Sequence, residues 1–151
     1  MTGVDFSGWY RQDEGTFVVF ARSGSISAGR LITLSDGTAD NQIRINLAVS
    51  SNSLRADLEV VAGGVSQVST TTTPVFAVGS MVAIAFAYKA NDFAISVNGG
   101  TVVTDTSGTV PTVDRMRIGT DHAGANSHNG TVARIAYYPK RLLELQSLSA
   151  Q

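Results

Sequence analysis

The sequence predicts an all-β protein, an antiparallel β-sandwich with one short helix near its C-terminal end. Apolar and polar residues alternate through most of the stretch from residue 16 to residue 138, as they do in strands that bury one face. Turn signals rich in Gly, Asn, Asp and Ser separate these runs at the spacing typical of a sandwich or closed jelly roll. Helical spacing of apolar residues is found only after Pro139.

The clearest alternating runs lie between residues 42 and 60. The core face is predicted to hold Ile43, Ile45, Leu47, Val49, Leu54, Leu58 and Val60. The opposite face is predicted to hold Arg44, Asn46, Ala48, Arg55, Asp57 and Glu59. Two half-buried strands are expected here, because successive side chains of a strand point to opposite faces.

Later segments predict further parts of the sandwich. Residues 81–89 are apolar on both faces, which is typical of a central strand covered on both sides. The pair Asn98-Gly99 joins two alternating runs and favours a tight hairpin turn. Residues 69–74, "STTTTP", are expected to cross between the sheets, because Pro74 lacks the N–H that a strand ladder needs.

The last segment, "PKRLLELQSL", predicts the helix. Pro139 can occupy the first helical turn, where a missing N–H costs nothing. Leu142, Leu145 and Leu148 would then share one face against the sandwich.

Length and composition restrict the class of protein. With 151 residues, one domain spanning 1–151 is expected, and such a chain buries roughly 70% of its unfolded surface. The net charge of −1 argues against binding to nucleic acid or to an anionic membrane surface. The absence of cysteine excludes disulfides and thiolate-bound zinc. No apolar run approaches the ~20 residues of a membrane span, and no targeting signal is recognisable.

Several motifs resemble a known group of domains. They are "FSGWYRQDEGTFVVF", "LITLSDGTADNQIRI", "AYKANDFAISVNGG" and the closing "HNGTVARIAYYPKRLLELQSLSA". Together they are similar to laminin-G-like, concanavalin A-like jelly-roll domains found near the C-termini of bacteriophage and prophage tail proteins. The resemblance implies two stacked antiparallel sheets, sugar or cell-surface recognition, a location in the virion and a homotrimer. It does not imply a particular ligand, because the fold carries many functions.

The carboxylates of the chain argue against an enzyme. Glycosidases use two carboxylates that flank one glycosidic bond. The only glutamates are Glu14, Glu59 and Glu144, and Asp13 and Glu14 would point apart on a strand. Asp57 and Glu59 share a face beside Arg55, where a solvated charge row is the simpler interpretation. No G-x-S-x-G nucleophile motif occurs. We therefore predict no catalytic residues and no cofactor.

A loop that carries both histidines is the predicted binding region. If strands cross in antiparallel order, the connections near residues 23–30, 50–53, 70–80, 98–100 and 119–130 lie at one end of the sandwich. Long loops on a rigid scaffold commonly carry binding sites. The predicted ligand-binding residues are Asp121, His122, Asn126, His128 and Asn129. A plain connecting loop is the alternative, and a metal site is not expected, because this set is too small and too open.

Two other residue groups suit more than one role. Trp9 and Tyr10 are expected near Tyr137, where an aromatic cluster would hold the ends of the chain together. The same aromatic patch is the alternative sugar-binding site. Outward-facing arginines at residues 44, 55, 115, 117 and 134 suit either a subunit contact or a solvated strand face.

Two functions follow from these observations. The first is a non-catalytic module of a phage tail fibre, or of a related virion protein, that binds a cell-surface glycan or another host receptor. The alternative is a structural virion component without a glycan ligand, such as a capsid or tail decoration or a trimerising cap. Other virion proteins are expected partners in either case.

Overall fold

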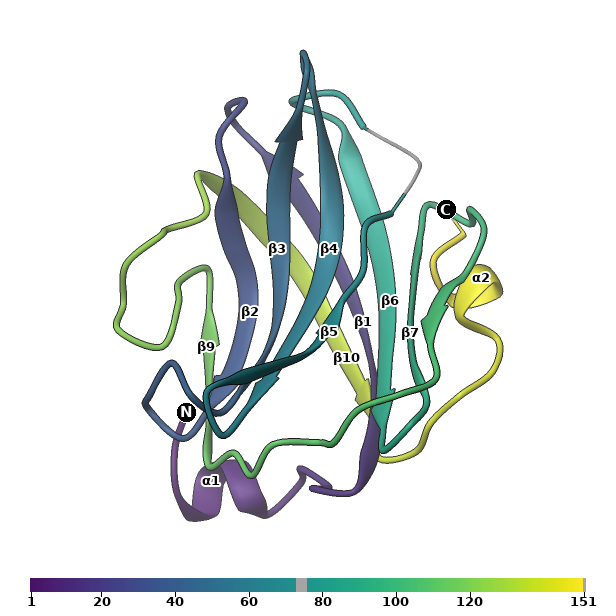
Figure 1. The fold of residues 1–151 in the computed structure, drawn as a ribbon. Helices are drawn as coiled ribbons and strands as arrows, with labels where there is room; N and C mark the ends of the chain where they lie inside the picture. The colour runs from purple at the N-terminus through teal and green to yellow at the C-terminus, as the bar shows by residue number, and fades with distance from the viewer. Residues whose placement is uncertain (73–75, 151) are drawn as a thin grey trace.

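Two five-stranded antiparallel sheets packed face to face form the protein in the computed structural model, which describes residues 1–72 and 76–150 (Figure 1). The strands are β1 (Glu14–Ser23), β2 (Gly29–Ser35), β3 (Gln42–Ser50), β4 (Ser53–Ala62), β5 (Val65–Ser69), β6 (Met81–Lys89), β7 (Phe93–Val97), β8 (Val103–Asp105), β9 (Arg115–Ile118) and β10 (Gly130–Tyr138). Sheet A has the order β5-β4-β3-β2-β9, and sheet B has the order β10-β1-β6-β7-β8. The fold class predicted from the alternation is confirmed.

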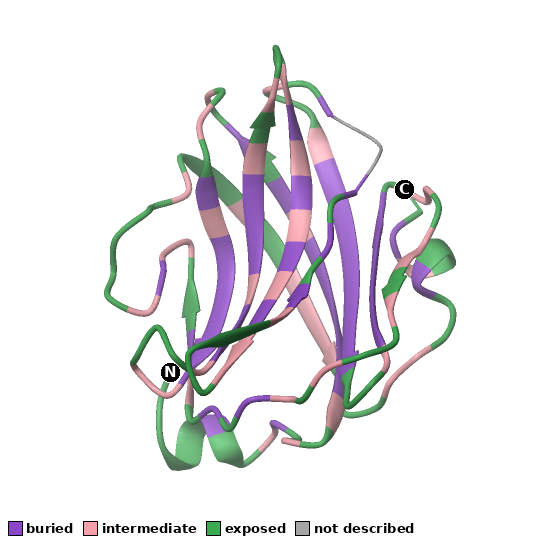
Figure 2. Ribbon diagram, viewed as in Figure 1, coloured by how far each residue is buried: buried purple, intermediate pink, exposed green. Residues whose placement is uncertain are grey.

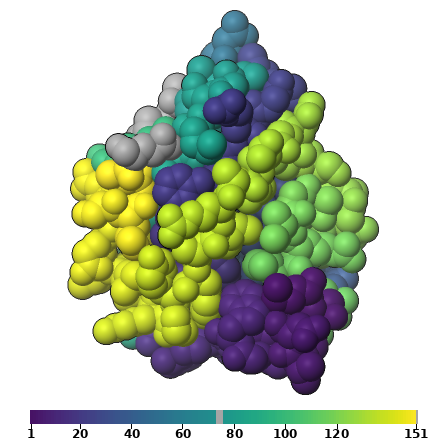
Figure 3. All heavy atoms as spheres, turned by 180° about the vertical axis from the view of Figure 1, so that it is seen from behind, coloured from purple at the N-terminus to yellow at the C-terminus, as the bar shows by residue number. Residues whose placement is uncertain are grey.

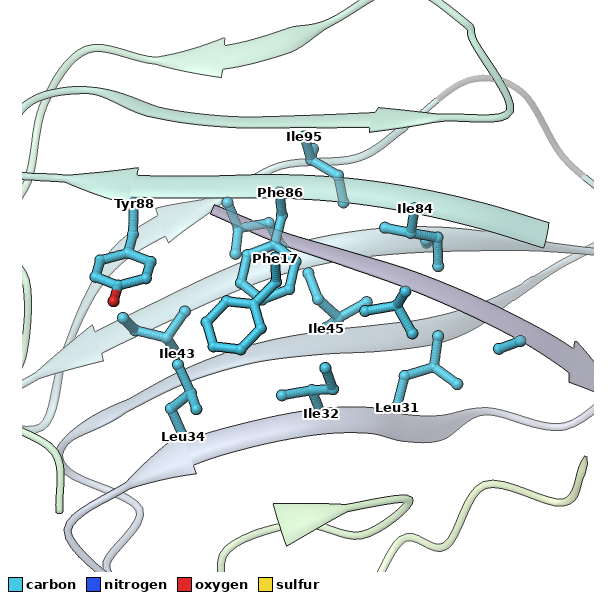
Figure 4. Packing of buried hydrophobic residues seen from close by; sticks show 14 of the residues in the cluster. Phe17, Leu31, Ile32, Leu34, Ile43, Ile45, Ile84, Phe86, Tyr88 and Ile95 are labelled. Atoms are coloured by element: carbon cyan, nitrogen blue, oxygen red, sulfur yellow. The ribbon is translucent and has the colours of Figure 1, made fainter. Parts of the chain in front are cut away.

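The core between the sheets is built from the residues that the alternation placed there. Ile43 and Ile45 of sheet A meet aromatic and aliphatic side chains of sheet B (Figure 4). Phe17 and Phe86 stack with ring centroids 5.1 Å apart. Val49 is the exception, because its side chain is 45% exposed. It lies near the tip of the β3–β4 hairpin, which extends beyond the body of the sandwich (Figure 1).

Strand β6 is central in sheet B, as its apolar sequence predicts. Residues 82–88 are all buried. One face of the strand contributes to the main core. The other contributes Ala85 and Ala87 to a second small cluster that also contains Leu145.

The turn at Asn98-Gly99 also has the expected geometry. Both residues have positive φ, 49° and 68° respectively. A positive φ is the conformation for which Asn and Gly are favoured in tight turns. β7 pairs with the short β8 on the other side of this connection.

The helical prediction is only partly right. The segment after Pro139 is not helical, because its backbone bonds to β1 instead. Arg141 N–H donates to Glu14 at 3.0 Å and Leu142 N–H donates to Thr16 Oγ1 at 2.9 Å. Helix α2 is a single turn, Leu145–Leu148. A second one-turn helix that the sequence analysis did not predict, α1 (Val4–Ser7), precedes β1.

The connections lie at the two ends of the sandwich as the antiparallel order predicts. The β1–β2 and β3–β4 connections and the turn after β7 lie at one end, which the long connection between β9 and β10 also reaches (Figure 1). Residues 69–74 were predicted to cross between the sheets, but the described residues after β5 stay beside β4: Thr70 N–H donates to the carbonyl of Leu58 at 3.0 Å, and Phe76 exchanges backbone hydrogen bonds with Leu54. The crossing to β6 of sheet B therefore comes after Phe76. The predicted role of Pro74 in this crossing falls outside the described residues. No helix within residues 1–72 and 76–150 is long and apolar enough to span a membrane.

Candidate functional site

The loop of residues 119–129 is held in shape by one buried carboxylate. Asp121 Oδ1 accepts hydrogen bonds from the backbone N–H groups of Ala123 and Ala125, at 2.9 and 2.8 Å. Its Oδ2 accepts a third, from the side-chain amide of Asn126 at 2.6 Å. The bond from Asn126, followed by that from Ala125, lowers the pKa of Asp121 to about 2. Asp121 and Asn126 therefore bond mainly within the loop and keep it rigid.

The remaining predicted loop residues connect this loop to its surroundings. The His128 ring lies with Nε2 3.2 Å from the carbonyl oxygen of Arg22, and burial lowers the pKa of this histidine. Asn129 donates to Ser25 Oγ at 3.1 Å. The half-buried His122 differs, because its Nδ1 is buried and has no hydrogen-bond partner among the described residues. Of the five predicted residues, His122 is the one whose side chain keeps an unused buried polar atom.

A second group of polar side chains lies on the outer face of sheet A, beside this loop. Arg30, Asn46 and Asp57 are direct cross-strand neighbours on β2, β3 and β4, and we call them the polar row. Side chains at such positions lie within about 5 Å of one another at Cβ. The face around them shows bands of intermediate exposure on these strands (Figure 2). The polar row is thus a compact array fixed on rigid strands.

Each member of the polar row has a buried polar atom that forms no hydrogen bond. These atoms are Arg30 Nε, Asn46 Oδ1 and Asp57 Oδ1. Asn46 is only 9% exposed, and its other amide atom, Nδ2, donates to Glu59 at 2.8 Å. Asp57 Oδ2 accepts a hydrogen bond from Arg55 at 3.3 Å, while Oδ1 lies 3.3 Å from the same Arg55 Nε in their ion pair but accepts no hydrogen bond from the described residues. Buried polar groups are normally paired, so these atoms indicate a place for water or a ligand.

The next row of the same face is internally neutralised. Glu59 Oε2 accepts from Arg44 Nε at 2.9 Å, and the two side chains form an ion pair. Burial alone would raise the pKa of Glu59, but the hydrogen bond and charge of Arg44 hold it below its ordinary value. Thr33 of β2 lies under the loop and donates from Oγ1 to the carbonyl of Thr120 at 2.9 Å. This hydrogen bond connects the loop of residues 119–129 to the outer face of sheet A.

Arg30 is a half-buried cation of this region. Burial, followed by repulsion from Arg44, lowers the pKa of Arg30, while Glu59 and Asp121 act in the opposite direction. No ion pair among the described residues includes Arg30. Its half-buried guanidinium can therefore accept an anionic or hydroxylated ligand without breaking an existing bridge.

The sequence pattern predicted which residues lie on this face, but it did not predict a ligand site there. Alternation placed Arg44, Asn46, Asp57 and Glu59 on one outward face, but the interpretation was a solvated or interface surface. Arg30 lies at a bulge in β2, between Arg30 and Ile32, so simple alternation does not place it. The unpartnered atoms depend on side-chain packing, which no sequence pattern contains.

The aromatic residues named as an alternative patch lie together in the structure. The Trp9 and Tyr137 rings are 5.0 Å apart, and Tyr10 stacks between Phe6 and Tyr88 at 4.5 and 5.6 Å. Tyr10 is 9% exposed, and Trp9 Nε1 donates to the carbonyl of Asp5 at 2.8 Å. Their rings pack on each other and attach the N-terminal segment to β10 and the core.

The carboxylates of the described residues give little support for catalysis or for metal binding. Asp57 and Glu59 lie on one face, but each takes part in an ion pair with an arginine. Among residues 1–72 and 76–150, no group of three His, Asp or Glu side chains could hold a metal ion.

Solved structures with the same fold include proteins that bind carbohydrates. The CBM40 domain of Ruminococcus gnavus IT-sialidase bound to α2,3-sialyllactose has a TM-score of 0.74 at 15% identity, over 93% of this chain and 84% of that one. A heptameric SAP-like pentraxin from Limulus polyphemus has a TM-score of 0.70 at 15% identity, over 90% and 68% of the two chains. Mouse laminin α1 LG4-5 has a TM-score of 0.65 at 10% identity, over 86% and 36%.

These similarities establish the fold alone. The chain has the jelly-roll sandwich that laminin-G, pentraxin and CBM40 domains share. The laminin-G-like part of the sequence resemblance is confirmed at the level of the fold. No protein-family model matches the chain, and no curated protein matches it in sequence.

Proposed function

We propose that this domain is a non-catalytic glycan-binding module that acts in a phage tail fibre or related virion protein. The observation that carries the proposal is the polar row, Arg30, Asn46 and Asp57, with its buried unpartnered atoms on a rigid sheet. Amide, carboxylate and guanidinium groups are the partners that sugar hydroxyls require. The phage context rests on the sequence resemblance.

The binding face proposed here includes part of the predicted loop. Residues 119–129 border the polar row, since the loop contacts Thr33 of β2 and the charge of Asp121 acts on Arg30. His122 is the loop residue with a free buried nitrogen, so it is the one expected to contact ligand. Asp121 and Asn126 act indirectly, by holding the loop in place.

An acidic glycan is the first ligand to test. The half-buried Arg30 has no carboxylate partner within residues 1–72 and 76–150, so a sugar carboxylate would pair with it and a neutral sugar would leave it unpaired. The R. gnavus domain is a CBM40 bound to α2,3-sialyllactose, which makes sialyllactose the natural probe with lactose as its neutral counterpart.

The experiment combines a glycan array with calorimetric titration of the positive sugars. Arg30→Gln should weaken binding about tenfold or more, because it removes a charged hydrogen bond. Asn46→Ala and His122→Ala should each weaken it several-fold. Arg22→Gln is the matched control, since Arg22 lies on β1 of sheet B and also forms no ion pair within the described part of the chain.

The results of these experiments distinguish a site on sheet A from a site at the aromatic patch and from a structural role without a glycan ligand. Binding that Trp9→Ala abolishes in a folded protein, and that these sheet A variants do not change, would move the site to the aromatic patch. Absence of binding to every glycan and to host cells would support the structural virion component instead.

The oligomeric state belongs to the same proposal. We expect a homotrimer, as the resemblance to tail proteins implies. Light scattering on the purified domain measures this directly, and a monomer at micromolar concentration would contradict it.

A further inference from the structure

We propose that the outer face of sheet B carries a second, independent site for a small carboxylic acid with an apolar body. The site is a pocket of about 210 Å³ between β1, β10 and α2. It is lined by Val18, Phe20, Arg134, Ala136, Tyr138, Ser147 and Leu148. In the view from behind, atoms of β1 are visible between β10 and the C-terminal segment (Figure 3).

The pocket exists because α2 covers only part of this face. Leu145 is fully buried against Ala85, Ala87 and Ala94 of β6 and β7. α2 contacts these two strands, and Val18 also joins the cluster. Towards the sheet edge, Phe20 and Ala136 pack on the same cluster but stay partly exposed. The floor of the pocket is therefore apolar and already ordered.

The rim of the pocket carries polar groups that are available to a ligand. The exposed Arg134 guanidinium lies over the Phe20 ring, 5.9 Å from its centre. Within residues 1–72 and 76–150, Arg134 forms no ion pair, and the hydroxyls of Tyr138 and Ser147 form no side-chain hydrogen bond. These groups surround one apolar floor.

The chemistry of the pocket selects the ligand class. An arginine can bind a carboxylate through two parallel N–H donors, and a hydroxyl can add a third. The apolar floor of Val18, Ala136 and Leu148 requires a hydrocarbon body next to that carboxylate. The volume lies below the range of drug-sized sites, so the ligand is of the size of one ring or one branched chain.

The surrounding charge favours the same class of ligand. Arg22 follows Phe20 by two residues on β1, so it lies on the same face, and it also forms no ion pair with any described residue. Two unpaired arginines on one face attract an anion. This differs from sheet A, where Arg44 and Arg55 are neutralised by neighbouring carboxylates.

Phenylacetate is a suitable probe, and phenylacetamide is its neutral counterpart of equal shape. In a nuclear magnetic resonance titration of the intact domain, we expect phenylacetate to shift the amides of β1, β10 and α2 with a dissociation constant at or below about 1 mM. The amide should bind at least tenfold more weakly, because it cannot form the charged pair.

Two variants test the site in different ways. Arg134→Gln should weaken phenylacetate binding tenfold or more, whereas Arg22→Gln, with the same change in charge, should change it by less than threefold. Ala136→Leu should fill the pocket and abolish binding without any change in charge.

Several outcomes would overturn the proposal. They are equal affinity for the acid and the amide, equal losses in the two arginine variants, and amide shifts located away from β1, β10 and α2. Failure to saturate with any aromatic or branched aliphatic acid would also overturn it. Thermal unfolding of each variant identifies any that fails to fold, and Arg134→Lys then replaces Arg134→Gln as the variant with intact charge but no planar fork.

Discussion

The outer faces of sheet A and sheet B are covered in different ways. On sheet B, small side chains at Ala85, Ala87 and Ala94 let α2 approach closely and bury Leu145 completely. On sheet A, long charged side chains cover the sheet themselves through pairs such as Arg44–Glu59. One face is therefore partly covered by an added element, and the other stays open with ordered polar groups. The open face is the one suited to a hydrophilic ligand such as a glycan.

The largest expected effect concerns the face that α2 partly covers. Leu145→Ala should lower the free energy of unfolding by about 2–5 kcal/mol, because it removes a fully buried side chain and leaves a cavity. Urea denaturation monitored by tryptophan fluorescence measures this. Leu143→Ala, at a 77% exposed leucine in the same segment, is the matched control and should cost less than about 0.5 kcal/mol. Equal effects would mean that burial of Leu145 beneath α2 does not stabilise the fold.

The second effect concerns the charged pairs of sheet A. Glu59→Ala should lower the free energy of unfolding by about 1–3 kcal/mol, because it leaves Arg44 and Asn46 Nδ2 without their acceptor. The double variant Arg44→Met with Glu59→Leu should recover much of this loss, since it leaves no unpaired charge behind. A double variant as unstable as Glu59→Ala would show that the pair itself, rather than the unpaired charge, determines the stability of this face.

The third effect concerns the loop beside the open face. Asp121→Asn should cost about 1–2 kcal/mol near neutral pH, because two amide groups would then face each other where Asn126 now donates to a carboxylate. The pKa of Asp121 is lowered to about 2, against about 3.9 for an unfolded aspartate. Its contribution is therefore complete above pH ~4 and is lost as pH falls towards 2.

A series of measurements at different pH tests whether the lowered pKa of Asp121 contributes to stability. The difference in stability between wild type and Asp121→Asn should shrink between pH 4 and pH 2, measured by thermal unfolding. A difference that stays constant over that range would show that Asp121 has an ordinary pKa and that the loop is held by other contacts.

The fold could be predicted from the sequence because alternation reports burial directly. It placed Ile43, Ile45 and Leu58 in the core and Asp57 and Glu59 outside, as the structure has them. It failed where a strand leaves the sandwich, at Val49, because alternation continues after the opposing sheet has ended.

The binding regions were less predictable, for two physical reasons. Side chains that look available in the sequence, such as Asp121 and Asn126, bond to their own loop. The polar row, in contrast, is formed across three strands and depends on a bulge at Arg30. The sheet B pocket depends on how far α2 extends, and the sequence predicted a longer helix starting at Pro139 than the single turn at Leu145–Leu148.

The smallest expected effect compares one unpaired arginine from each face. Arg134→Met should lower the free energy of unfolding by about 0.5 kcal/mol, because it removes the stacking of the guanidinium on Phe20. Arg30→Met should be neutral or slightly stabilising, because the native side chain holds a buried Nε without a partner and is repelled by Arg44. Paired thermal melts at equal protein concentration resolve differences of this size. A loss of more than 1 kcal/mol in Arg30→Met would show that this arginine stabilises the fold, and it would remove the main reason for assigning it to a ligand.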